Sequence, residues 1–376
     1  MATALIIAGE KSGENYGAAV VRRIKEINPA ITFFGIGGKN MEAAGVDILF
    51  PMESLAVVGI AEVIGQLPRI RKIFGKIRRE VRSRMPAAAL LIDSPDFNLR
   101  LAKRLWKLDV PVLYYISPTV WAWRAGRLKI IRRYVRKMLL IFPFEEAIYR
   151  KARISSRFVG HPLLERVRTA FGRENFCRRY GLDPEKKIIA LLPGSRRSEI
   201  RYHLPVLVEA VKKLRRDRPV QFVLIRSEDL DPDFLQHFIP QDLKDLKVIG
   251  ENAYEALAAA DLALSACGTA NLEAALLGTP LVAFYRLSPL TYFAGVKLVK
   301  IKLYSIVNIL AGEDIIPELI QRDFTADNLV REAKRVLESQ ELRSAMKSRF
   351  AKIRAELGQE PASKNVADEL ARLIKV

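Results

Sequence analysis

The chain has 376 residues, half of them apolar, and its 62 basic residues outnumber 42 acidic ones to give a formal net charge of +20. This length favours two or three domains, each with a substantial core. Two cysteines far apart in sequence exclude a disulfide framework and the usual zinc spacing. No uninterrupted apolar run approaches the roughly 20 residues that span a bilayer. The basic excess favours anionic partners such as nucleic acid, acidic lipid or a phosphorylated substrate.

Short apolar runs alternate with amphipathic segments along the whole chain, which predicts parallel sheets flanked by helices. The first strand starts almost at Met1 with no basic segment and cleavage site before it, so we expect a cytosolic protein. In the first half, strands are predicted near 3–8, 31–36, 88–92, 111–116, 138–142 and 157–159, and helices near 14–27, 97–107 and 145–151. In the second half, strands are predicted near 187–192, 220–225, 246–249, 261–264 and 281–284, and helices near 203–215, 253–259, 270–277, 326–338 and 341–356.

Polar or glycine-containing turns follow the C-terminal ends of seven of these strands. They lie at 9–14, 93–96, 117–119, 143–145 and 160–162 in the first half, and at 193–196 and 265–269 in the second. Open parallel sheets bind ligands outside the carboxyl ends of their strands. The two sets therefore predict two Rossmann-like α/β domains facing a shared cleft, which suits an enzyme that joins two substrates.

The first turn has glycines at positions 9, 13 and 17, where a strand leads into a helix. This spacing fits neither a Walker loop nor GxGxxG. It predicts a turn that binds an anion or a sugar at a helix N-terminus, or a tight turn with only a structural role. The candidate binding residues of this turn are Gly9, Glu10, Ser12 and Gly13.

Two carboxylates, Asp93 and Asp96, follow the apolar strand 88–92. The mouth of a sheet is a position from which a general base reaches a substrate hydroxyl. Asp96 is placed to cap the helix that begins near Phe97, which leaves Asp93 as the better candidate for catalysis.

Two turns of the second half predict a nucleotide diphosphate site that needs no metal. In the segment 193–199, backbone N–H groups, the Ser195 hydroxyl and the forked guanidinium of Arg196 can bind phosphate. In the segment 268–273, the amides near Gly268 and Thr269 can hold phosphate, while Glu273 can accept both ribose hydroxyls.

A stretch from 55 to 84 combines an apolar first part with a strongly basic second part whose apolar residues recur at helical spacing. This pattern is typical of an interfacial helix on anionic lipid, and equally of a domain helix with a solvated basic face. A second basic run, 124–137, contains no acidic residue and widens the same surface.

The chain resembles the lipid-A-disaccharide synthase family, glycosyltransferases with the two-domain fold called GT-B. The resemblance covers nearly the whole length and rests on AGEKSGE at 8–14, LAVVGIAEV at 55–63, IDSPDFN at 92–98, ISPTVWAWR at 116–124, FPFE at 142–145, VGHPL at 159–163, LLPGSR at 191–196, SACGTANLE at 265–273 and NILAG at 308–312. The PGSR and GTxxLE segments are shared more loosely with other GT-B enzymes. Positions 11 and 14 hold Lys and Glu where the family has Thr and Asp.

The resemblance implies transfer of 2,3-diacylglucosamine from its UDP derivative to the 6-hydroxyl of 2,3-diacylglucosamine 1-phosphate, with inversion. Asp93 would then remove the proton of the acceptor hydroxyl, and Asn308 would contact donor or acceptor. Helix N-termini and Arg196 would stabilise the departing UDP, so we expect no metal and no cofactor. Trp121 and Trp123 are interpreted as core or interface aromatics, and His161 as a structural residue.

The same resemblance predicts a peripheral enzyme on the cytoplasmic face of the inner membrane, in contact with anionic lipid. The expected domains are 1–165 for the acceptor, 166–345 for the UDP-sugar, and a helical segment 346–376 that packs on the first domain or on a partner subunit of a homodimer. Two alternatives stay open. One is another UDP-sugar GT-B enzyme, either the peptidoglycan N-acetylglucosaminyltransferase or an epimerase. The other is a basic nucleic-acid-binding protein, against which no aromatic-interleaved platform or helix-turn-helix is visible, so no nucleic-acid partner is expected.

Overall fold

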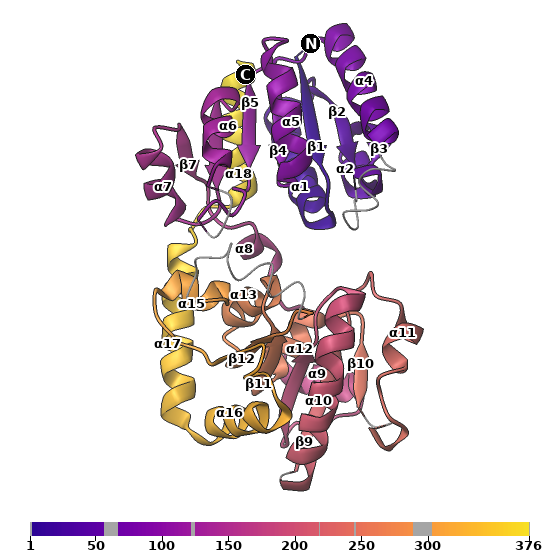
Figure 1. The fold of residues 1–376 in the computed structure, drawn as a ribbon, viewed down its shortest axis with the longest axis vertical. Helices are drawn as coiled ribbons and strands as arrows, with labels where there is room; N and C mark the ends of the chain where they lie inside the picture. Colours follow the sequence, from indigo (N-terminus) through magenta and orange to yellow (C-terminus); the bar gives the residue numbers. More distant parts are fainter. Residues whose placement is uncertain are drawn as a thin grey trace. The chain divides into compact units, whose positions relative to one another are not determined.

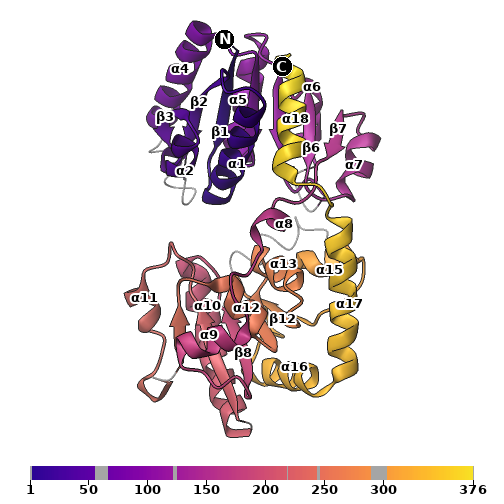
Figure 2. The same cartoon turned by 180° about the vertical axis from the view of Figure 1, so that it is seen from behind.

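The computed structural model describes residues 2–55, 67–121, 125–217, 219–243, 246–288 and 303–375. The chain forms two compact units (Figures 1 and 2). Unit 1 consists of Met1–Pro162 together with Leu357–Val376, and unit 2 consists of Leu163–Glu356. The chain thus leaves unit 1 once and returns to it for its last twenty residues, within the segment that the sequence assigned to a separate third part.

Unit 1 is built on an all-parallel seven-stranded sheet with the order β3-β2-β1-β4-β5-β6-β7. The strands are β1 (Thr3–Ala8), β2 (Thr32–Gly37), β3 (Val46–Pro51), β4 (Ala88–Ile92), β5 (Val112–Tyr115), β6 (Lys137–Leu140) and β7 (Ser156–Phe158). The chain builds outward from β1 in one direction and from β4 in the other. The order therefore reverses between β1 and β4, and such a switch point is where open sheets bind ligands.

Helices cover both faces of this sheet. One buried cluster joins it to α1 (Lys11–Ile27), α2 (Lys39–Ala43) and α18 (Ala362–Ile374). The other joins it to α4 (Leu67–Arg84), α5 (Pro95–Trp106), α6 (Arg127–Tyr134) and α7 (Glu145–Lys151), with the short 3-10 turn η1 (Met52–Leu55) at the end of β3. The C-terminal helix α18, yellow in Figure 2, packs on α1, and its Glu369 accepts hydrogen bonds from Lys137 and Arg157 at 2.7 Å each.

Unit 2 contains an all-parallel six-stranded sheet with the order β10-β9-β8-β11-β12-β13, which reverses between β8 and β11. The strands are β8 (Lys187–Leu192), β9 (Val220–Ile225), β10 (Lys247–Ile249), β11 (Leu262–Ala266), β12 (Leu281–Tyr285) and β13 (Glu318–Ile320). The helical segments are α8 (Leu163–Arg166), α9 (Arg173–Tyr180), α10 (Arg197–Asp217), α11 (Pro232–Gln236), η2 (Gln241–Leu243), α12 (Ala253–Ala259), α13 (Thr269–Leu276), α15 (Ile306–Ala311), α16 (Ala326–Glu338) and α17 (Gln340–Glu356). The helices α10 and α16 pack together and on the strands. The helices α12 and α13 also pack on the strands, and they contact α9 and α17, respectively.

The strands and helices expected from periodicity are present, so the prediction of two parallel α/β sheets is confirmed. The sequence missed the edge strands β3 and β13, the short helices α2, α11 and α15, and α6, which lies inside the basic run. Short elements carry too few residues to display a period.

The helix α4 settles one alternative for its part of the 55–84 stretch. Its apolar residues Ile73, Phe74, Ile77 and Val81 are buried in the core, while most of its basic residues are exposed. It is thus a domain helix with a solvated basic face. Residues 56–66, which carry most of the apolar part, lie outside the described residues. None of the helices in the described ranges combines the length and apolarity needed to span a membrane.

Candidate active site

The backbone that follows β4 places Asp93 at the switch point of unit 1. Asp93 and Ser94 both adopt left-handed conformations, with φ values of 49° and 43°. Two buried side chains hold this turn, because Tyr114 Oη and Asn98 Nδ2 donate hydrogen bonds to the Asp93 carbonyl at 2.6 and 2.8 Å. Left-handed backbone costs about 1–3 kcal/mol for each non-glycine residue and recurs at functional sites, where the surrounding structure enforces it.

The side chain of Asp93 lines a pocket of about 230 Å³ at the same edge of the sheet. Burial, and next the negative charge of Glu10, raise the pKa of Asp93 from 3.8 to about 6, against the opposing effects of the Ser94 amide and the Arg127 charge. Such a group is ionised at neutral pH yet more basic than an ordinary aspartate. It therefore has the protonation state and the basicity that a general base requires.

The wall of this pocket also contains Ser117, Thr119, Arg127 and Glu145, none of which the sequence singled out as chemistry. Arg127 donates a hydrogen bond to Asp96 at 2.8 Å, and the Asp96 side chain is otherwise largely exposed. The prediction that Asp96 caps a helix near Phe97 is wrong. The helix α5 begins at Pro95, so that Ser94 occupies the cap position and Asp96 lies in the first turn.

The glycines of the first turn are explained by close packing inside unit 1. A Cβ atom at Gly9 would lie 2.4 Å from Ser94 Oγ, and one at Gly13 would lie 3.3 Å from the Ile92 side chain. The turn after β1 can therefore rest directly on the turn after β4. Glu10 and Ser12 are exposed, and neither lines the pocket of Asp93 that the described part of the chain forms. A ligand contact for any residue of this turn stays a prediction.

Glu14, which the sequence left without a role, has a structural one. Its buried carboxylate accepts hydrogen bonds from the backbone N–H groups of Asn40 and Met41 at 2.6 and 3.0 Å. These amides lie in the first turn of α2 and have no partner within that helix, so the Glu14 side chain supplies their hydrogen-bond acceptor.

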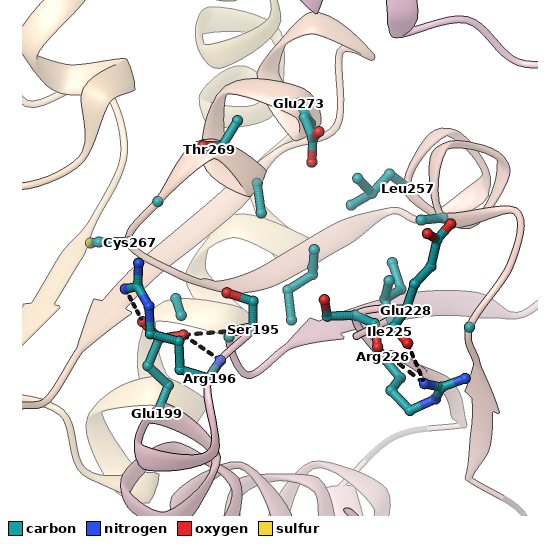
Figure 3. A pocket seen from close by; sticks show the side chains of 18 of the residues that line it. Ser195, Arg196, Glu199, Ile225, Arg226, Glu228, Leu257, Cys267, Thr269 and Glu273 are labelled. Carbon is teal, nitrogen blue, oxygen red and sulfur yellow. Dashed lines mark hydrogen bonds and ion pairs between the residues drawn. The ribbon is translucent and has the colours of Figure 1, made fainter. Parts of the chain in front are cut away.

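Unit 2 brings five of the predicted site residues to one pocket of about 430 Å³: Ser195, Arg196, Gly268, Thr269 and Glu273. In Figure 3, Thr269 and Glu273 lie on the helix at one side and Ser195 and Arg196 on the loop across from them. The walls between are formed by residues after β9 and β10 and by the apolar side chains of Ile225 and Leu257. The pocket therefore spans the carboxyl edge of the sheet around its switch point.

A carboxylate that the sequence analysis missed occupies the loop after β8. Glu199 Oε2 accepts hydrogen bonds from the amides of Ser195 and Arg196 at 2.8 and 3.2 Å. Its Oε1 accepts from the Arg196 guanidinium at 3.3 Å and from Tyr285 Oη at 3.0 Å. Glu199 is the third residue of α10, and its bond to the amide just before the helix is the glutamate half of a capping box. Arg196, rather than Ser or Thr, stands three residues before it, so the sequence lacked the usual signal of this motif. The two amides assigned to phosphate are thus already bound by the protein itself.

The start of α13, by contrast, has no such internal partner among the described residues. Its N-cap is Gly268, which makes no side-chain cap, and a Cβ added there would meet nothing within 4 Å. One turn further, burial raises the pKa of Glu273, whose carboxylate accepts a hydrogen bond from Tyr254 Oη at 3.1 Å. The open helix N-terminus and the inward-pointing carboxylate supply complementary groups for phosphate and for hydroxyls.

Asn308 does not belong to this pocket. It is fully buried, and its Oδ1 accepts from the amides of Ile315 and Ile316 at 3.0 Å each. Its Nδ2 donates to the Ile316 carbonyl at 3.0 Å and to Glu318 Oε1 at 2.8 Å. The amide is therefore fully used in holding the loop between α15 and β13.

The structure describes only some of the remaining residues and motifs that the sequence analysis named. His161 is buried against Phe142, with ring centroids 5.2 Å apart, and burial lowers its pKa to about 3, so it is neutral at physiological pH. Trp121 packs edge-on against Phe144 at 5.4 Å. Trp123 and the LAVVGIAEV motif beyond Leu55 lie outside the described residues. Within the described ranges, no group of three or more His, Cys, Asp or Glu side chains is arranged to hold a metal.

Comparison with known proteins decides the family. The family profile described as lipid-A-disaccharide synthetase matches residues 4–374. The lipid-A-disaccharide synthase of Koribacter versatilis (strain Ellin345) is 42% identical over 378 residues, which cover 100% of this chain and 98% of that protein. The chain belongs to the lipid-A-disaccharide synthase family. It is therefore a glycosyltransferase of lipid A biosynthesis, and the resemblance inferred from its motifs is confirmed.

Solved structures agree on the fold. The UDP-GlcNAc 2-epimerase from Neisseria meningitidis bound to UDP-GlcNAc superimposes with a TM-score of 0.68 at 13% identity, covering 98% of this chain and 100% of that one. CalG4, the calicheamicin glycosyltransferase, gives 0.64 at 14% identity, covering 100% and 98%. These likenesses show the GT-B fold alone. The family relationship over the full length favours neither the epimerase, the peptidoglycan transferase nor the nucleic-acid-binding alternative.

Proposed function

We propose that the protein transfers 2,3-diacylglucosamine from its UDP derivative to the 6-hydroxyl of 2,3-diacylglucosamine 1-phosphate, with inversion and without a metal. The products are UDP and a β-1′,6-linked tetraacyl disaccharide 1-phosphate. The observation that carries the proposal is the pocket of unit 2, where Arg196, Thr269 and Glu273 converge in a chain whose family implies a UDP-sugar donor and a sugar-phosphate acceptor.

The donor is assigned to unit 2. Glu273 accepts hydrogen bonds from the ribose hydroxyls, while the first amides of α13 receive the diphosphate at the positive end of the helix. The Arg196 side chain is 75% exposed and donates only one hydrogen bond to Glu199 among the described residues, so most of its fork is available to phosphate. As the bond between the anomeric carbon and the diphosphate breaks, these groups stabilise the charge that accumulates on UDP. We infer that they replace a divalent ion.

The acceptor is assigned to unit 1. Asp93 removes the proton of the acceptor 6-hydroxyl, whose oxygen attacks the anomeric carbon from the face opposite the diphosphate. The electron pair of the broken C–O bond leaves with UDP, and a single displacement of this kind inverts the anomeric centre. The pKa of Asp93 near 6 supports this role, because the group is ionised at pH 7 and accepts a proton more readily than a solvated aspartate.

The site of action is proposed to be the cytoplasmic face of the inner membrane. Both substrates carry acyl chains and negative charge. The exposed basic residues of α4, including Arg71, Arg78 and Arg79, supply cations near which anionic lipid gathers at about 1 kcal/mol per charge. The acyl chains would then stay in the inner leaflet while the sugars are bound.

The test is release of UDP from UDP-2,3-diacylglucosamine in detergent with excess chelator, with and without 2,3-diacylglucosamine 1-phosphate. Acceptor-dependent release with a β-linked disaccharide product is expected. Release that needs added magnesium would overturn metal independence only, and an α-linked product would overturn inversion only. If UDP release does not depend on the acceptor either with chelator or with added magnesium, the substrate assignment is rejected.

A further inference from the structure

Glu145 is a buried carboxyl that the proposed reaction leaves without a task. It is the first residue of α7, and only 1% of it is exposed. Its Oε2 atom is inaccessible to solvent and has no hydrogen-bond partner among the described residues, yet Glu145 lines the same 230 Å³ pocket as Asp93. Buried polar atoms are almost always paired, so an orphaned atom on the wall of a pocket points to a ligand that pairs with it.

The surroundings of Glu145 decide which protonation state it adopts. Burial raises its pKa to about 7, although the Ser117 hydroxyl, the backbone at Phe142 and the nearby Trp121 indole favour the ionised form. The indole N–H is also buried and makes no hydrogen bond of ordinary geometry within the described residues. The carboxyl is therefore largely protonated below neutral pH.

The charged and titratable groups around the pocket are compatible with a protonated Glu145 carboxyl. Asp93 is an anion above pH 6, and the Arg127 charge is paired with Asp96. On its own helix, Tyr149 shares a hydrogen bond with Ser117 at 2.8 Å and has its pKa raised by burial, so it stays neutral. The neighbouring His161 is neutral as well, because burial lowers its pKa. The pocket thus holds one carboxylate that accepts protons and one carboxyl group that can donate a hydrogen bond.

We propose that Glu145 binds the sugar-phosphate acceptor, donating a hydrogen bond from its protonated carboxyl to a substrate oxygen while Asp93 accepts the proton of the attacking hydroxyl. This inference rests on the proposed function. Two carboxyl groups whose environments separate their protonation states are a recurrent arrangement for dividing such tasks. The acceptor is rich in oxygens that only accept hydrogen bonds, namely its carbonyls and phosphate, and an ionised Glu145 would repel them.

The experiment measures the acceptor KM and kcat from about pH 6 to pH 8.5 for the unmodified enzyme, Glu145→Gln and the control Glu146→Gln. If only the protonated carboxyl binds, KM rises about fivefold between pH 7 and pH 8. The glutamine amide donates at every pH, so Glu145→Gln should lose that rise. Glu146 is the next residue of α7, and its carboxylate accepts a hydrogen bond from the Phe158 amide at 3.1 Å, so Glu146→Gln should keep the rise.

Ionisation of the substrate phosphate affects all three proteins equally, so the difference between their profiles isolates Glu145. Equal profiles for the unmodified enzyme and Glu145→Gln would overturn the inference, even where both make the disaccharide. Failure of every protein to release UDP would instead reject the proposed function. Should Glu145→Gln not fold, calorimetric titration of the unmodified enzyme with acceptor at pH 7.5 decides the question. Net proton uptake is expected, and zero uptake or proton release would overturn the inference.

Discussion

The substitution Glu10→Gln is expected to move the acid limb of the activity–pH profile to lower pH. That limb reports the ionisation of Asp93, because the proposed base acts only as a carboxylate. Burial is the main reason why the pKa of Asp93 rises from 3.8 to about 6, and the negative charge of Glu10 is the second reason. Without that charge, the pKa of Asp93 should fall but stay above its ordinary value.

The size of the shift follows from the exposure of Glu10. Interactions between exposed charges are typically worth about 0.2–1 kcal/mol, and one pKa unit corresponds to about 1.4 kcal/mol, which gives a shift of about 0.1–0.7 unit. Glu10 is exposed, so added salt should reduce the shift further. In the unmodified enzyme, a single group with a pKa of about 6 is roughly one-tenth ionised at pH 5, which predicts a roughly tenfold loss of kcat/KM there.

The assay is kcat/KM for the acceptor between about pH 4.5 and pH 7, at low and at high ionic strength. The matched control is Glu26→Gln, at the other end of the same helix, where the carboxylate pairs with Arg23 at 2.9 Å on the surface. This control should leave the limb in place. A profile without an acid limb, or a limb that Glu10→Gln does not move at low salt, would refute the electrostatic account of Asp93.

Three further outcomes are expected. Asp93→Asn should abolish turnover while UDP-sugar binding persists, and it should raise the free energy of unfolding at pH 7 by up to about 3 kcal/mol. The gain is expected because the pKa of Asp93 is higher in the folded than in the unfolded protein, so the ionised carboxylate opposes folding from about pH 4 upward. Thermal melts at pH 7 and at about pH 3.5 check that this gain disappears in acid. Arg196→Ala should weaken UDP binding in calorimetry roughly tenfold or more, since it removes a charge-assisted contact, and unchanged affinity would reject its phosphate role. Asn308→Ala should lower the free energy of unfolding in urea melts by about 2–4 kcal/mol, because it leaves two buried backbone amides unpaired. The UDP affinity of the folded protein should stay unchanged, and a selective loss of that affinity would support Asn308 as a ligand contact.

The fold was predictable because its long strands are buried on both faces and therefore appear as continuous apolar runs. β1, β4, β8 and β11 each combine such a run with a polar or glycine turn at the carboxyl end. The edge strands escaped detection for the opposite reason. β13 has only three residues, and β3 is mostly half-exposed, so neither presents the pattern of an interior strand.

The sequence could predict candidate site residues only where the residue type and a position just after a strand were enough to identify them. Ser195, Arg196, Gly268, Thr269 and Glu273 met that condition and share one pocket. Glu145 did not, because nothing in FPFE reveals that its carboxyl is buried and unpaired on the wall that contains Asp93. For Asn308, a ligand contact stays a prediction. An asparagine in a family motif suggests a ligand, whereas the structure shows four hydrogen bonds to its own loop.

Glu199 changes how the donor pocket distributes its charge. Its carboxylate binds two amides of the loop after β8 and one arm of Arg196, so this loop is already ordered and locally neutralised before a nucleotide arrives. A diphosphate entering there would have to displace Glu199, at the cost of the capping bonds and of the hydrogen bond from Tyr285. The uncapped start of α13 imposes no such cost. The diphosphate should therefore bind chiefly against Gly268 and Thr269, with Arg196 approaching it by its exposed side, while Glu199 fixes the loop from which that arginine extends.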